Sequence, residues 1–131
     1  NYMERLYNKN TDNWKGVVST FTKISKTSKE HNLNLAVMIF TQLLNESNWE
    51  NYSRARDYQK QVIEELKNNE IKVVDLYDMF SKHNPSDLRI SAKDGHPNEF
   101  AHSLTANYLM NKVLSDTSLW IYANVKTSAN K

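Results

Sequence analysis

The sequence predicts an α/β fold in which helices alternate with the strands of a parallel sheet. Two short apolar segments, residues 33–40 and 71–76, have the composition of buried strands. Longer segments in which apolar residues recur every three or four positions lie before, between and after them. Because a helix between two such strands forms a right-handed crossover, we expect the strands to run parallel. At 131 residues the chain has room for one domain, spanning residues 1–131.

The first predicted helix runs from Asp12 to His31. Its apolar positions follow helical spacing and are Trp14, Val17, Val18, Phe21 and Ile24. Thr11 or Asp12 can cap its start, and the polar step at His31–Asn32 ends it. The first strand then covers Leu33 to Phe40, and its consecutive apolar residues predict burial on both faces.

A polar loop at residues 41–51 follows the first strand at its carboxyl end. Trp49 and Tyr52, close to this end, either line a substrate crevice or anchor the loop. A second helix runs from Tyr52 to Leu66 with its apolar residues along one face, and Asn68–Asn69 ends it. The second strand covers Ile71 to Leu76.

Beyond the second strand we expect a single helical turn at Asp78–Lys82 and a long loop from Pro85 to His96. Pro97 suits the first turn of a helix, where a missing backbone N–H leaves no bond unmade, and this helix continues to Val113. Residues 120–125 form a last strand or a packed arm, and residues 126–131 are expected to be a flexible tail.

Two adjacent parallel strands leave open sheet edges and are unusual as a complete sheet. We therefore expect further strands N-terminal to residue 1. On this interpretation the chain is the C-terminal part of a doubly wound domain.

The composition narrows the range of partners. Seventeen basic and fifteen acidic residues leave a net charge of +2, and the basic residues are spread along the chain, which argues against a nucleic-acid groove. No apolar run approaches the roughly 18–20 residues that a membrane-spanning helix needs. The absence of cysteine excludes disulfides and thiolate catalysis, but it does not select a cellular compartment.

Asp94, His96 and Pro97 follow the second strand and lead into the last helix, at the edge where open α/β sheets bind ligands. In extended backbone, side chains two residues apart share a face, so the Asp94 carboxylate can accept the Nδ1–H of His96. Pro97 restricts His96 to extended conformations. The Nε2 of such a histidine is free to take a proton from a nucleophile, while the carboxylate holds its tautomer. We expect this Nε2 to face a crevice at the carboxyl edge of the sheet. Asp94 and His96 are therefore the candidate catalytic residues.

The segment Asp94-Gly95-His96-Pro97-Asn98, followed by Ala101-His102, resembles the last conserved block of SGNH (GDSL-like) hydrolases, in which a D-x-H-P-N-x-x-G-H pattern occurs. The similarity covers about residues 71–114 and includes Leu88–Ser91 as the lead-in. The resemblance implies a flavodoxin-like three-layer α/β/α sandwich with a Ser-His-Asp triad, in which Asp94 orients His96 and His96 is the general base. It also implies a serine esterase or acylhydrolase that forms an acyl-enzyme and needs no metal or organic cofactor. Its substrates would be acyl esters, such as acetyl groups on carbohydrate or lipid.

Four features depart from the family pattern. Many members space the pair as D-x-x-H, which would place Lys93 at the acid position, and Ala101 stands where glycine is usual. The family's Gly-Asp-Ser nucleophile block does not occur in these 131 residues, and Gly16 lies in a predicted helix and not in an oxyanion-hole motif. The resemblance therefore implies that the serine belongs to the N-terminal half of the domain, in the same or a separate chain.

Other interpretations of the same residues stay open. Asp94 can instead cap the last helix with His96 merely exposed, and His102 is expected to have a packing or helix-surface role. We do not expect a metal site of Asp94, His96 and His102, because the histidines lack i, i+4 spacing and no thiolate is present. The alternative function is that of a non-catalytic α/β domain that binds a glycan or takes part in protein assembly, since a shared fold does not guarantee retained chemistry.

The remaining aromatic and charged residues are expected to have structural roles. Aromatic residues on apolar stripes are predicted to lie in the core, and these are Trp14, Phe21, Tyr58 and Phe100. Arg54 and Arg56 are expected to form surface salt bridges on the second helix, and His31 and His83 are expected to face solvent.

Overall fold

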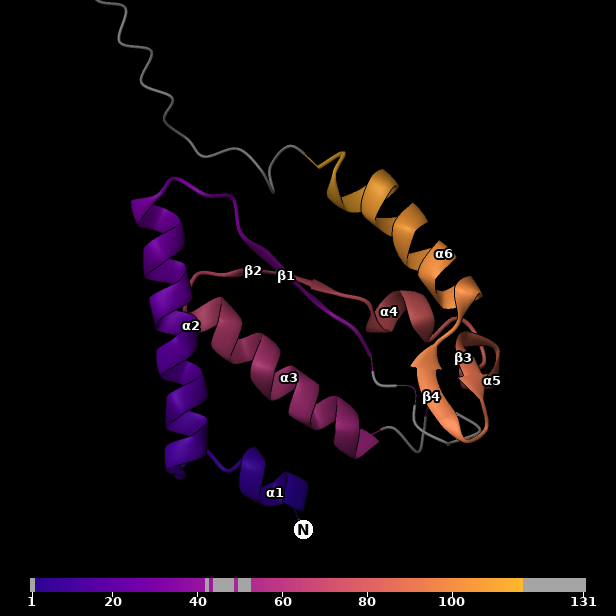
Figure 1. The fold of residues 1–131 in the computed structure, drawn as a ribbon, viewed down its shortest axis with the longest axis horizontal. Coiled ribbons are helices and arrows are strands. Elements are labelled where there is room, and N and C mark those ends of the chain that lie inside the picture. The colour runs from indigo at the N-terminus through magenta and orange to yellow at the C-terminus, as the bar shows by residue number, and fades with distance from the viewer. Residues whose placement is uncertain (1, 42, 44–48, 50–52, 117–131) are drawn as a thin grey trace, which may run out of the picture.

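A computed structural model describes residues 2–41, 43, 49 and 53–116 and shows a mixed α/β fold (Figure 1). The elements are, in order, α1 (Tyr2–Leu6), α2 (Asp12–Glu30), β1 (Ala36–Ile39), α3 (Ser53–Asn68), β2 (Lys72–Asp75), α4 (Tyr77–Phe80), α5 (Pro85–Leu88), β3 (Arg89–Ser91), β4 (Asp94–Pro97), α6 (Glu99–Tyr108) and the π-helix η2 (Leu109–Val113). The predicted α/β class is confirmed in this general form. Tyr52 and residues 120–131 lie outside the described residues.

β1 and β2 pair in parallel, as predicted, with a register that runs from Ala36↔Lys72 to Ile39↔Asp75. Helix α3 connects them and packs against β2. In Figure 1, α2 and α3 lie on one side of this strand pair and α6 lies on the other. Both strands point toward α4 and the β3–β4 hairpin, so the hairpin lies beyond the carboxyl ends of the parallel pair.

Helices α2 and α3 end in the same way, one before each parallel strand. Asn32 and Glu70 have positive φ angles of 54° and 58°, the left-handed conformation that closes many helices. The backbone N–H of Leu33 then bonds the Ser28 carbonyl at 2.8 Å, and that of Ile71 bonds the Leu66 carbonyl at 3.0 Å. These closures reverse the chain sharply, which brings each strand back along its own helix. The predicted helix ends at Asn32 and Asn68–Asn69 are therefore confirmed.

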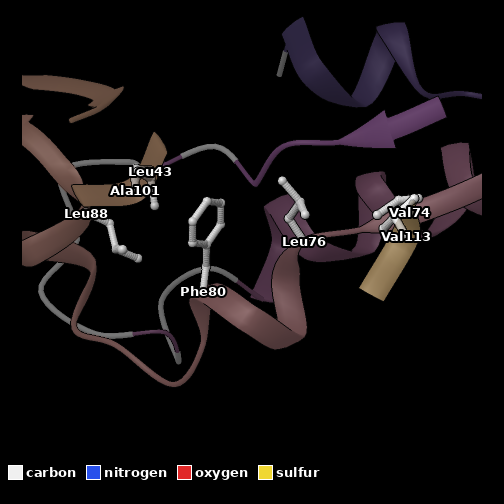
Figure 2. Packing of buried hydrophobic residues seen from close by; sticks show 7 residues of the cluster. All are labelled: Leu43, Val74, Leu76, Phe80, Leu88, Ala101 and Val113. Carbon is white, nitrogen blue, oxygen red and sulfur yellow. The ribbon is translucent and has the colours of Figure 1, made fainter. Parts of the chain in front are cut away.

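The core gathers where the carboxyl ends of the parallel strands meet α6. It consists of buried apolar side chains from six parts of the chain: Leu43, Val74, Leu76, Phe80, Leu88, Ala101 and Val113. Figure 2 shows the Phe80 ring between Leu76 on one side and Leu88 and Ala101 on the other. The cluster thus joins β2, α5 and α6, the elements that frame the candidate site.

The prediction of a long loop from Pro85 to His96 is wrong. This segment contains α5 and the antiparallel hairpin of β3 and β4, joined by a turn at Ala92–Lys93. Strands of three and four residues are too short to show a clear alternation of apolar and polar residues, so the pattern gave no signal. The two parallel strands are likewise shorter than predicted, and β1 is only partly buried.

The last helix also differs from its prediction. Pro97 closes β4 instead of opening the helix, which begins at Glu99 and becomes a π-helix at Leu109. Phe100 is 44% exposed and is therefore not a core residue, because the buried face of α6 carries Ala101 and Thr105. Trp14 is buried as predicted.

Replacing Phe80 with alanine is expected to lower the free energy of unfolding by about 3–5 kcal/mol, because the ring fills the centre of the core and its loss leaves a cavity. Met110→Ala is the control, since this side chain on η2 is exposed and should change stability by no more than about 0.5 kcal/mol. Urea denaturation followed by circular dichroism measures both. Equal losses in the two variants would contradict the assignment of the core.

Candidate active site

The β3–β4 hairpin carries the candidate residues at the carboxyl end of the parallel strands. Arg89 pairs with Pro97 and Ser91 pairs with Asp94, with an irregularity between the two pairs. Leu88, directly before β3, is fully buried in the core cluster. The hairpin is therefore anchored at its base and reaches away from the core toward its turn.

Asn98 joins the hairpin to α6. Its side-chain Oδ1 accepts the Ala101 backbone N–H at 3.0 Å and caps the helix. Its Nδ2 donates to the carbonyl oxygens of Asp87 at 2.9 Å and Arg89 at 3.1 Å, and its own backbone N–H donates to the Leu88 carbonyl at 2.9 Å. These four bonds fix the start of α6 against α5 and β3. The cap of α6 thus belongs to Asn98, so Asp94 does not cap this helix as the alternative interpretation required. Two other parts of that interpretation are observed, since Asp94 accepts a backbone N–H and His96 is exposed.

Asp94 and His96 form the hydrogen bond predicted for them. The Asp94 Oδ1 lies 2.6 Å from the Nδ1 of His96 and also accepts the His96 backbone N–H at 3.0 Å. A carboxylate only accepts, so Nδ1 carries a proton, and in the neutral imidazole Nε2 then presents a lone pair. Both residues lie on β4, where their i, i+2 spacing brings the two side chains to one face. We call this pair the Asp94–His96 dyad.

The dyad is open to solvent. The side chain of His96 is 84% exposed and that of Asp94 is 43% exposed. The prediction that Nε2 faces a crevice at the carboxyl edge of the sheet is wrong for the described residues, because a ring so exposed is not enclosed by them. Its accessible Nε2 can instead meet a group brought by another segment or molecule.

The hydrogen bonds hold the pKa of the Asp94 carboxyl below its ordinary value. The His96 backbone N–H is the largest cause, and the bond from the His96 side chain is the second. Because both donors come from one residue, the lowered pKa of Asp94 depends on the extended shape of β4. An ionised partner is what keeps the proton of His96 on Nδ1.

The other candidate residues take structural positions. His102 is exposed on α6 with its ring 6.1 Å from that of Phe40, in agreement with a helix-surface role. The Trp49 indole N–H donates to the His83 carbonyl at 2.7 Å, which confirms loop anchoring for Trp49. Among the described residues, no group of three histidine, aspartate or glutamate side chains is arranged to hold a metal ion.

Arg56 does not form the surface salt bridge that was predicted. Its guanidinium binds both carboxylate oxygens of Asp75, at 3.1 and 2.5 Å, and the two side chains are only 14% and 25% exposed. The sequence carried no signal for this pair because its members lie 19 residues apart, on α3 and at the end of β2.

None of the described helices is long and apolar enough to cross a membrane.

Comparison with protein-family models, curated proteins and solved structures finds no significant match to this chain.

Replacing Asn98 with alanine is expected to lower the free energy of unfolding by about 1–3 kcal/mol, because the helix cap and both bonds to carbonyl oxygens are lost. Asn98→Ser keeps a capping oxygen but is too short to reach Asp87 and Arg89, so its loss should be about half as large. Chemical denaturation gives both values. A serine variant as stable as the original protein would show that the bonds to the hairpin contribute nothing.

The Asp94 carboxyl is expected to titrate below the ordinary aspartate pKa of about 3.9 in a carbon-13 NMR titration. In His96→Ala the pKa should rise only part of the way, because the backbone N–H bond remains. Since the folded pKa lies below the unfolded one, ionised Asp94 stabilises the fold above the ordinary pKa, and this contribution is lost as pH falls through the depressed value. His102→Ala should leave the titration unchanged. An Asp94 pKa at or above the ordinary value would contradict the hydrogen-bonded dyad.

Proposed function

We propose that this protein supplies the acid–base dyad of an SGNH-type serine esterase, with Asp94 as the orienting carboxylate and His96 as the general base. One observation carries the proposal: a single oxygen, Asp94 Oδ1, accepts both the backbone N–H and the ring Nδ1–H of His96. This arrangement fixes the tautomer in which Nε2 is the free base. The D-x-H-P-N resemblance supplies the reaction class.

The proposed reaction is hydrolysis of an acyl ester. His96 Nε2 accepts the hydroxyl proton of a serine as the serine oxygen attacks the ester carbonyl, and it then returns that proton to the leaving alcohol. Water, deprotonated by the same Nε2, releases the acid from the acyl-enzyme. Asp94 stabilises the imidazolium in both steps. Acetyl or other acyl groups on carbohydrate or lipid are the proposed substrate class.

The serine is proposed to come from a segment outside residues 1–131 or from another chain, since no Gly-Asp-Ser block is present. The exposed side chain of His96 leaves room beside it for an incoming nucleophile. The same segment would bring donors for the oxyanion. Further strands beside β1 would extend the parallel pair toward a flavodoxin-like three-layer sandwich.

Hydrolysis of p-nitrophenyl acetate by the complete gene product tests the proposal. His96→Ala is expected to lower kcat/KM by about 10²–10⁴-fold, because general base catalysis is lost. Asp94→Asn should lower it as well, since the amide does not hold the required tautomer. The matched control is His102→Ala, which removes an exposed histidine from α6 and should leave the rate near that of the original protein.

Each outcome separates the two candidate functions. Equal rates above background for the original protein and His96→Ala would refute the role of His96. No hydrolysis of any acyl ester by the complete gene product would instead favour the non-catalytic domain that binds a glycan or another protein.

A further inference from the structure

A series of directional contacts links α3 to the first turn of α6, directly after the dyad strand. It begins with the pair of Arg56 and Asp75, in which the two nitrogens of one guanidinium bind the two oxygens of one carboxylate. Such a two-point contact fixes the angle between its partners as well as their distance. Asp75 is the last residue of β2, so the pair fixes the carboxyl end of that strand against α3.

Tyr77, the first residue of α4, joins the same pair. Its backbone N–H donates to Asp75 Oδ1 at 3.1 Å, and the Arg56 guanidinium carbon lies 4.2 Å from the centre of its ring. The ring face attracts the cation while the N–H bonds the anion. Arg56 therefore orients both the strand end and the helix that follows it.

The contacts continue through two edge-to-face ring pairs. The Trp49 ring lies edge-on to Tyr77 with centroids 5.4 Å apart, and its indole N–H donates to the His83 carbonyl. The His83 ring in turn lies edge-on to Phe100, at 5.3 Å. Edge-to-face ring pairs favour one relative orientation. We call these six residues the Arg56–Phe100 network: Arg56, Asp75, Tyr77, Trp49, His83 and Phe100.

The network ends four residues after His96. Only Pro97 and Asn98 separate His96 from α6, and both are restrained, one by its ring and the other by its four hydrogen bonds. The first turn of α6 is therefore joined to the end of β4 through two restrained residues. Phe100 itself is 44% exposed, so burial alone does not fix its position.

We propose that Arg56 and Trp49 are positioning residues for the Asp94–His96 dyad, acting through His83 and Phe100 on the first turn of α6. This inference rests on the proposed function, because it assigns Arg56 and Trp49 to the same site. Neither residue touches the dyad, and each acts by holding the geometry that keeps Asp94 against the ring of His96.

Nitrogen-15 NMR of the His96 ring tests the proposal by measuring the fraction of molecules with the proton on Nδ1. Arg56→Lys keeps the charge but not the two-point geometry, and Trp49→Phe keeps a ring but not the indole N–H. Each should reduce the fraction in the Nδ1–H form, with a population ratio changed by about twofold or more, as expected for coupled neighbours. Ile63→Val, a buried change near the other end of α3, is the control of comparable destabilisation and should leave the fraction unchanged.

The readout does not depend on turnover, so it distinguishes this inference from the proposed function. Loss of the Nδ1–H form in Arg56→Lys and Trp49→Phe, but not in Ile63→Val, supports the positioning role even if no ester is hydrolysed. An unchanged fraction in both network variants, or an equal loss in Ile63→Val, would overturn it, because the effect would then be absent or would follow from general destabilisation alone.

Discussion

The hydrogen bonds of Asn98 are the constraint on which the rest of the site depends. A single side chain caps α6, binds the carbonyl of Asp87 in α5 and binds the carbonyl of Arg89 in β3. Every hydrogen of its amide has an acceptor, so the side chain has one satisfied orientation. The core cluster stabilises these elements without regard to direction, whereas the amide sets the angle at which β4 enters α6. Asp94 and His96 both lie on β4, so the position of the dyad depends on that angle.

The dyad is ordered by its own hydrogen bonds, although the described residues leave it exposed to solvent. The ring of His96 is held directly by bonds within β4, because the donor and acceptor come from neighbouring positions of one strand. A crevice, by contrast, needs walls from several elements. The described part of the chain therefore contains the hydrogen-bonded pair that the proposed function needs, and the proposed serine and crevice walls would come from outside it.

The sequence patterns predicted those features that depend on residues close together in the chain. Helix α2, its Thr11 cap and the bond between Asp94 and His96 depend on residues within four positions of one another, and each was predicted from spacing. The hairpin was missed because three-residue and four-residue strands are stabilised by their neighbours more than by their own composition. The bidentate pair of Arg56 and Asp75 was missed for the same reason, since its members meet only after α3 has packed on β2.

The π-helix at the end of α6 has a consequence for how this region tolerates changes in length. The Leu114 N–H reaches back five residues to the Leu109 carbonyl, so this turn holds one more residue than an α-helical turn does. The wider turn brings Val113 onto the buried face, where regular α-helical spacing from Thr105 would have placed Lys112. Removing one residue between them would restore α-helical spacing and keep valine at the buried position. The bulge thus holds one residue more than a regular α-helix would need to place valine on the buried face.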